Sequence, residues 1–134
     1  MSGTQPTPHI DIRRSPLGRA RGLGAAHHGA GHWWAQRLSS LALVPLTLWF
    51  IISAIHLTGA THQTVIDWLS APWTMALMIA LVIATFHHTN LGLQVVIEDY
   101  VYDEQVKIPA LLAIKGLCVL LALVCIVSVL KIGL

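Results

Sequence analysis

Three long runs of apolar residues, separated by short polar connections, constrain this chain more than any other feature. They extend from about Trp33 to Leu57, from about Ala71 to Ile97 and from about Ile108 to Ile132. An α-helix needs about 20 residues to cross the hydrocarbon core of a bilayer, and each run is long enough. The runs show no two-residue alternation, which excludes a transmembrane β-barrel. The sequence therefore predicts an all-α integral membrane protein with three transmembrane helices.

The composition also favours a membrane protein over a soluble one. Of the 134 residues, 55% are hydrophobic and only 10% are charged, whereas a soluble domain carries about 25% charged residues. A chain of this length cannot enclose so much apolar surface in a water-excluding core. The net charge of +2, without a basic stripe that alternates with aromatic residues, gives no indication of nucleic-acid binding.

The positions of the charged residues predict how the chain crosses the membrane. Residues 1–31 form a polar arm with four arginines, and residues 32–134 form the transmembrane anchor domain. The connection at residues 58–70 has neither Lys nor Arg, whereas the second connection contains Lys107. The positive-inside rule therefore places the N-terminus and the second connection in the cytoplasm. The arm lacks the apolar stretch of a secretory signal peptide. Its composition faintly resembles a mitochondrial transit sequence, but we favour a cytoplasmic arm because it runs directly into the first helix.

The two cysteines, Cys118 and Cys125, both lie in the third apolar run. Their separation corresponds to about 10 Å along a helix, which is too far for a disulfide bond. We expect both to be small buried hydrophobic side chains.

Two adjacent histidines, His87 and His88, lie near the middle of the second run. Ionisable residues inside a membrane are costly and generally mark functional sites, and neutral imidazole is a common ligand of haem iron. Residues four apart share a helical face, and His88 continues a line of small residues that leaves room for a flat porphyrin. The same line would also allow another helix to pack closely, with His88 hydrogen-bonded inside. The small residues are Ala80, Ala84 and Gly92, whereas His87 lies beside the bulky Ile83 and Leu91.

Two further sites carry polar residues at the ends of the apolar runs. Glu98, Asp99 and Tyr100 end the second run. A tyrosine there would supply both a ring and a hydroxyl donor to a quinone, but it also fits a solvated helix end with an interfacial aromatic residue. Arg37 lies at the start of the first run, where it would either extend to water or pair with a carboxylate such as a haem propionate.

The segment GLGAAHHGAGHWWAQR, at residues 22–37, contains three histidines. His28 and His32 are four residues apart and would share a helical face, which is a possible arrangement for a metal site. The glycines between them and the absence of a nearby cysteine or carboxylate argue against one. We expect a loop that packs against a partner or a cofactor, and the roles of His27, His28 and His32 stay open.

The second run and its exit, HHTNLGLQVVIEDY at residues 87–100, resemble the hydrophobic membrane anchor family of succinate dehydrogenase (complex II). The family pattern is a His, a Gly four residues later, and Asp-Tyr eleven and twelve residues after the His. Here these residues are His88, Gly92, Asp99 and Tyr100. The segment GAGHWWAQRLSSLAL, which contains Arg37, is similar to the start of the family's first helix. The resemblance covers most of residues 20–134 and is alphaproteobacterial or mitochondrial-like in style. The double histidine departs from the pattern, since the family needs only one.

The resemblance implies a membrane anchor of a succinate:ubiquinone oxidoreductase. His88 would be one axial ligand of haem b, and a sister membrane anchor would supply the second. Tyr100 would hydrogen-bond ubiquinone with Asp99 beside it, and Arg37 would lie near the haem propionates or the quinone. A flavoprotein subunit and an iron–sulfur subunit would pass electrons from succinate, so this chain would complete an enzyme without being catalytic alone. Its location would be the bacterial cytoplasmic membrane or, alternatively, the mitochondrial inner membrane.

Two other functions remain as alternatives. A fumarate reductase anchor has the same architecture with the reaction reversed, and nothing in this chain sets the direction. A small transporter or channel protein would line a path with its polar residues. Against it, no acidic residue lies in the middle of a run, and the two histidines are adjacent rather than spread across the membrane.

Overall fold

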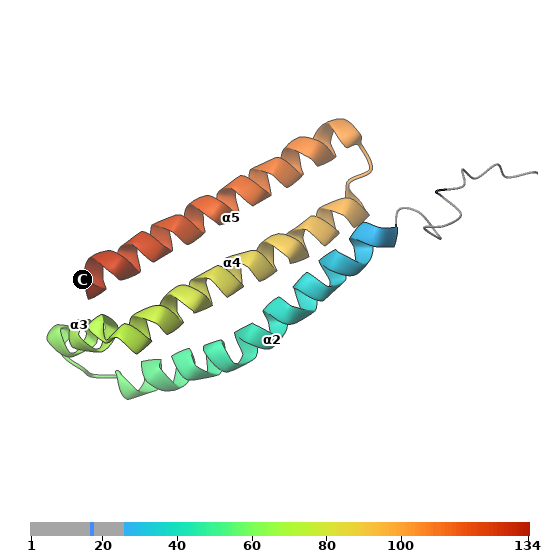
Figure 1. Cartoon of the computed structure of the whole chain (residues 1–134). Helices are drawn as coiled ribbons and strands as arrows, with labels where there is room; N and C mark the ends of the chain where they lie inside the picture. Colours follow the sequence, from blue (N-terminus) through green and yellow to red (C-terminus); the bar gives the residue numbers. More distant parts are fainter. Residues whose placement is uncertain (1–16, 18–25) are drawn as a thin grey trace, which may run out of the picture. The chain divides into compact units, whose positions relative to one another are not determined.

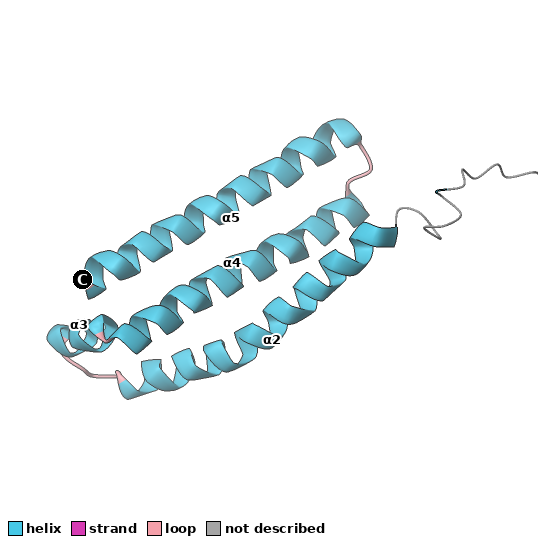
Figure 2. Ribbon diagram, viewed as in Figure 1, coloured by secondary structure: helices cyan, strands magenta, loops and turns pink. Residues whose placement is uncertain are grey.

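The structure, a computed structural model, describes Leu17 and residues 26–134. All regular secondary structure in this part of the chain is helical, which confirms the predicted all-α class (Figure 2). The helices are α2 (Ala26–His56), α3 (His62–Ser70), α4 (Pro72–Tyr100) and α5 (Glu104–Gly133).

Three of the described helices are long and apolar enough to cross a membrane. The spans are Ala30–His56, Pro72–Tyr100 and Glu104–Gly133, with mean hydropathies of 2.1, 1.5 and 2.8 in their most apolar windows. The prediction of three transmembrane helices is therefore confirmed.

The helices extend beyond the apolar runs, and two details of the prediction are wrong. The segment that carries His28 and His32 was expected to be a loop, but α2 already begins at Ala26. A glycine in a helix costs only about 1 kcal/mol relative to alanine, so the alanines and histidines around the glycines can still form helical turns. The connection at residues 58–70 also contains a helix, α3, which begins after the N-cap residue Thr61. Both regions are more polar than the apolar runs. An apolar run shows where a helix crosses the membrane, but it does not show where the helix begins and ends.

The short connection between α4 and α5 fixes the end of α4 that carries Tyr100. The Asp103 side chain caps α5 by accepting a hydrogen bond of 2.9 Å from the backbone N–H of Gln105. Lys107 Nζ lies 3.5 Å from the carbonyl oxygen of Glu98, where a cation complements the negative end of the helix dipole. The Lys107 contact joins the C-terminal end of α4 to the first turn of α5.

Within residues 32–134, α4 lies between α2 and α5 (Figure 1). The short helix α3 packs against both α4 and α5, and its Trp68 ring stacks on Trp49 of α2 with 5.9 Å between ring centroids. At the C-terminal end of α5, Gly133 packs closely against α3. A Cβ atom added to this glycine would lie only 3.2 Å from the carbonyl oxygen of Leu69. The helices are thus held together at both ends of α4.

Most of the large apolar side chains remain exposed in the isolated chain. Only 6% of the most apolar window of each span is buried. Large exposed apolar patches are covered by lipid or by partner subunits rather than by water. Both cysteines are free, as predicted, but only Cys118 is buried as expected, because Cys125 is half-buried in the isolated chain. Among the residues whose side chains the structure describes, those of Ser39, Leu69, Thr74, Leu91, Cys118 and Val129 are buried.

Candidate functional site

His88 lies at the contact between α2 and α4, where it meets a buried serine. Its Nδ1 atom is 3.0 Å from Oγ of Ser39, a residue that is only 8% exposed. The two helices run antiparallel here: Gln36, about one turn before Ser39 on α2, lies close to Gly92, about one turn after His88 on α4. In this chain His88 is therefore hydrogen-bonded inside a helix pair, as one of the two sequence interpretations expected. No described residue forms a hydrogen bond with its other ring nitrogen, Nε2.

An apolar groove of about 580 Å³ runs along the same pair of helices. Small side chains make room for it, among them Ala80 and Ala84, which were predicted to form a line with His88. His87 lines the groove and is exposed, whereas His88 is half-buried beside Ser39. The groove is therefore lined by His87 and by Ser39, the serine that contacts His88, and not by His88 itself. Its lining residues are Ala35, Leu38, Ser39, Ala42, Leu46, Ala80, Ile83, Ala84 and His87.

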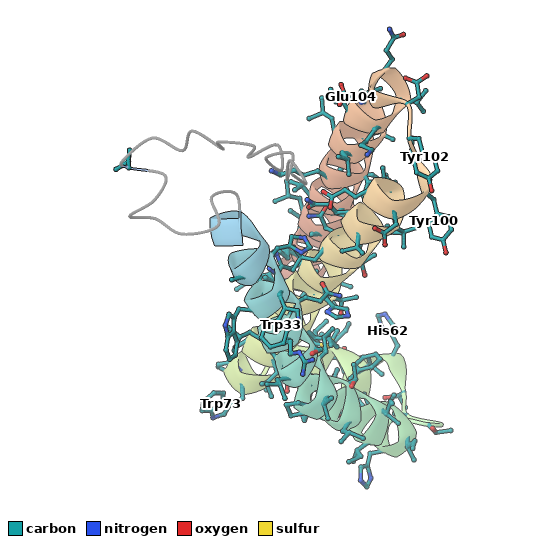
Figure 3. All side chains as sticks on the ribbon, turned by 90° about the vertical axis from the view of Figure 1, so that its right-hand side faces the viewer. Trp33, His62, Trp73, Tyr100, Tyr102 and Glu104 are labelled. Atoms are coloured by element: carbon teal, nitrogen blue, oxygen red, sulfur yellow. The ribbon has the colours of Figure 1, made fainter. Side chains whose placement is uncertain are left out.

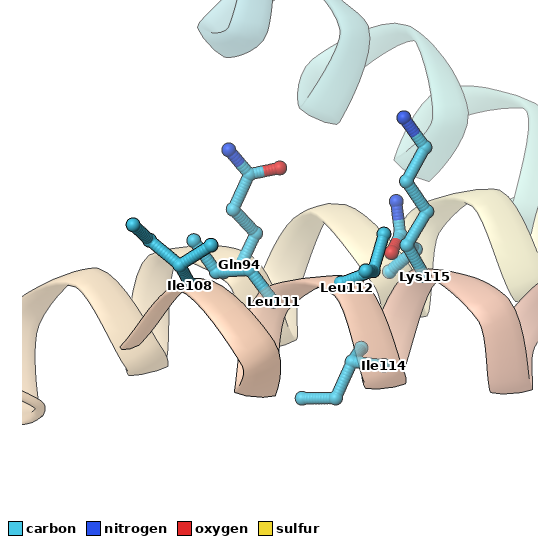
Figure 4. A pocket seen from close by; sticks show the side chains of 7 residues that line it. Gln94, Ile108, Leu111, Leu112, Ile114 and Lys115 are labelled. Atoms are coloured by element: carbon cyan, nitrogen blue, oxygen red, sulfur yellow. The ribbon is translucent and has the colours of Figure 1, made fainter. Parts of the chain in front are cut away.

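The other side of α4 forms a more polar surface with α5. Asn90, Gln94 and Lys115 line two neighbouring grooves of about 350 and 420 Å³, and His87 lines the larger of them. Figure 4 shows the Gln94 and Lys115 side chains directed to the same side of the helix pair. Gln94 donates a hydrogen bond of 2.8 Å to Oε1 of Glu98, one turn closer to the end of α4. His87 thus lies between an apolar groove and one that contains three more polar side chains, those of Asn90, Gln94 and Lys115.

Arg37 does not face His88 in this chain, although it was predicted to lie near the haem propionates or the quinone. Its guanidinium carbon lies 4.4 Å from the ring centroid of Trp33, one turn earlier on α2, in a cation–π contact. Arg37 is two residues from Ser39, which corresponds to about 200° around the helix. Because Ser39 faces α4, Arg37 lies on the opposite face of α2 and is exposed.

Tyr100 and Asp99 are exposed at the end of α4. The Tyr100 side chain is 78% exposed, and it projects outward beside Tyr102, which is 88% exposed (Figure 3). Twelve residues separate His88 from Tyr100, or about 18 Å along the helix. The two predicted sites are therefore at different depths on one helix, and the ring of Tyr100 is accessible to a ligand or a partner.

The polar face of α2 is the part of the site that the sequence interpretation missed. His32, Gln36 and Ser39 lie on one side of the helix, at spacings of four and three residues. Nε2 of His32 and Oε1 of Gln36 are buried and have no hydrogen-bond partner among the described residues. This periodicity of polar residues in an apolar helix is the signal that could have identified the face toward α4.

The fold and the site define a multi-pass membrane protein with a histidine in mid-span, held between two helices by one ring nitrogen. The chain belongs to the family of succinate dehydrogenase/fumarate reductase transmembrane subunits, whose family model matches residues 11–129. The family predicted from residues 87–100 is confirmed, and with it the role of a membrane anchor in this enzyme complex.

Individual relatives agree with the family. The succinate dehydrogenase hydrophobic membrane anchor subunit of Rickettsia bellii is 29% identical over 116 residues, which cover 87% of this chain and 93% of the relative. The corresponding protein of Paracoccus denitrificans is 31% identical over 86 residues, covering 64% and 67%. The succinate dehydrogenase membrane anchor subunit of Reclinomonas americana is 30% identical over 95 residues, covering 68% and 78%. No solved structure matches the chain significantly.

Proposed function

We propose that this chain is the membrane anchor of a succinate:ubiquinone oxidoreductase and contributes one axial ligand of haem b and part of the ubiquinone site. The observation that carries the proposal is His88, a mid-span histidine whose Nε2 atom has no hydrogen-bond partner among the described residues. It lies deeper along the same helix than an exposed tyrosine at the helix end. A b-type haem spectrum that depends on His88 in the assembled complex tests the proposal.

The residues around His88 fit a haem group. Imidazole nitrogen is a suitable ligand for haem iron, and a porphyrin needs an apolar surface with little bulk against the helix. The groove between α2 and α4 provides alanines on both helices for this purpose, and it is next to His88 through Ser39, which lines the groove and contacts Nδ1 of His88. When bound, haem b supplies a one-electron redox centre. The second axial ligand would come from the sister membrane anchor of the complex.

Tyr100 would hold ubiquinone by donating a hydrogen bond from its hydroxyl group to a quinone carbonyl. Its exposed position at the end of α4 supports this role, because a quinone diffusing in the bilayer would reach it there. Asp99 lies beside it in the sequence and is also exposed. Electrons from succinate would arrive through the flavoprotein and iron–sulfur subunits, so this chain binds and orients the acceptor and is not catalytic alone.

Arg37 would contact a haem propionate or a quinone only from outside the contact between α2 and α4. Its guanidinium lies on Trp33, on the face of α2 that is turned away from His88. A group that pairs with Arg37 would therefore lie between this face and another chain of the complex.

The family includes fumarate reductase subunits, in which the same architecture supports the reverse reaction. We favour succinate oxidation because the relatives described above carry the name succinate dehydrogenase. We place the chain in the bacterial cytoplasmic membrane, with the mitochondrial inner membrane as the alternative.

The proposed orientation leads to a direct prediction about topology. The arginine-rich arm and the absence of Lys and Arg in residues 58–70 predict a cytoplasmic N-terminus. A reporter that is active only outside the cytoplasm should function when fused at Gly59 and not when fused at Asp103. A cytoplasmic reporter should give the converse pattern. Activity of the first reporter at Asp103 alone would contradict both the orientation and the cytoplasmic position of Tyr100.

A further inference from the structure

Ser39 is placed between two hydrogen-bonding groups that together determine the direction of its hydroxyl proton. Its Oγ atom donates to the backbone carbonyl oxygen of Gln36 at 2.9 Å, and it lies 3.0 Å from Nδ1 of His88. A serine hydroxyl has a single proton and accepts hydrogen bonds with its oxygen lone pairs. A proton directed to Gln36 leaves the oxygen lone pairs to accept a hydrogen bond from Nδ1–H of His88.

This arrangement selects one form of the His88 ring. Nδ1 must carry a proton in order to donate to Ser39, and in the neutral imidazole the lone pair is then on Nε2. Nε2 is the atom that has no hydrogen-bond partner among the described residues. Metal-ligating histidines generally donate their other N–H to an acceptor, which fixes the tautomer and the ring orientation and increases the basicity of the ligand.

We infer that Ser39 is a positioning residue that holds His88 as the Nδ1–H tautomer and directs Nε2 to the haem iron. The inference rests on the proposed role of His88 as a haem ligand. Burial of Ser39 supports it, because a side chain that is only 8% exposed has little access to water that could replace the hydrogen bond. The bond to Gln36 restrains the hydroxyl further, because the acceptor lies in the same helix.

The next residue provides a matched control. Ser40 donates to the carbonyl oxygen of Arg37 at 2.8 Å, so it has the same backbone contact one position later. It lies about 100° further around the helix and has no contact with His88 among its described hydrogen bonds. Ser40→Ala therefore reproduces the loss of a hydroxyl from α2 without removing the acceptor of His88.

The test compares Ser39→Ala, Ser39→Thr and Ser40→Ala in the assembled complex. Loss of an outer hydrogen bond to a metal ligand typically weakens metal affinity about 10–100-fold. We therefore expect Ser39→Ala to release haem at least about tenfold more readily. The midpoint potential of the remaining haem should rise, because a less basic ligand stabilises ferric iron less. The low-spin ferric EPR signal should broaden as the ring loses its fixed orientation. Ser39→Thr should restore these properties, and Ser40→Ala should resemble the unsubstituted complex.

Other outcomes separate the inference from the proposed function. If His88→Ala removes the haem spectrum but Ser39→Ala and Ser40→Ala leave haem retention, potential and EPR signal equally unchanged, the inference about Ser39 is wrong while the ligand role stands. A loss of complex yield in Ser39→Ala without any change in potential or EPR signal would show a packing role and would also overturn it. If His88→Ala leaves the spectrum intact, the proposed ligand itself is wrong.

Discussion

Replacing His88 with alanine should abolish the b-type haem spectrum of the assembled complex. The substitution removes Nε2, the only nitrogen that the proposal assigns to the iron from this chain, so the haem would lose the ligand that this chain supplies. The Ser39 hydroxyl would also lose its hydrogen bond with His88 and keep the one to Gln36. Optical and EPR spectra of the purified complex measure the effect, with flavin content as a check that the soluble subunits are still attached.

His87→Ala is the matched control for this prediction. His87 lies next to His88 and lines grooves on both sides of α4, but it is exposed and forms no hydrogen bond with a described residue. Bis-histidine ligation should therefore persist in His87→Ala. If this variant alone loses the spectrum while His88→Ala keeps it, the ligand is His87, and the spacing to Asp99 and Tyr100 does not identify the haem site.

Tyr100→Phe should lower succinate-dependent ubiquinone reduction about tenfold or more. The substitution keeps the aromatic ring and removes only the hydroxyl donor to the quinone carbonyl. A bound quinone would bury the hydroxyl of Tyr100, which is exposed in the isolated chain. Loss of one partner from a buried hydrogen bond costs about 1–3 kcal/mol, and each 1.4 kcal/mol corresponds to about a factor of ten in rate. Succinate oxidation with an artificial acceptor that takes electrons before the membrane should be unchanged, and the haem spectrum should persist.

Tyr102→Phe is the control for a general effect at this end of the helix. Tyr102 lies two residues later and is even more exposed than Tyr100. The complex with Tyr102→Phe should retain full quinone reduction. Equal loss of both activities in Tyr100→Phe would indicate that Tyr100 supports assembly, and no loss in either would identify it as an interfacial aromatic residue without a role in quinone binding.

The membrane fold could be predicted from the sequence because apolar runs of about 20 residues have few alternatives. The helix ends could not, because polar residues form helical turns outside the apolar run as readily as loops. This is why α2 starts at Ala26 and α5 at Glu104. The short helix α3 lacks a long apolar run and was missed for the same reason.

The candidate site could be predicted in part. His88 and Tyr100 lie on one helix, so the distance between them along the helix axis follows from helical geometry alone. The contact between His88 and Ser39 requires the register of two helices, and a single sequence does not contain that register. The same limitation applies to Arg37. Its position at the start of the first apolar run follows from the sequence, but its direction relative to His88 depends on which face of α2 meets α4.

The most direct test of the central claim is a succinate-reduced minus oxidised difference spectrum of the complex purified through a tag on this chain. A membrane anchor that contributes a haem ligand should copurify with a flavoprotein and an iron–sulfur protein. Addition of succinate should then produce the absorption bands of a reduced b-type haem. A complex that oxidises succinate but shows no b-type bands, even after chemical reduction, would contradict haem ligation by His88. A preparation with neither succinate oxidation nor haem would contradict the proposed function as a whole.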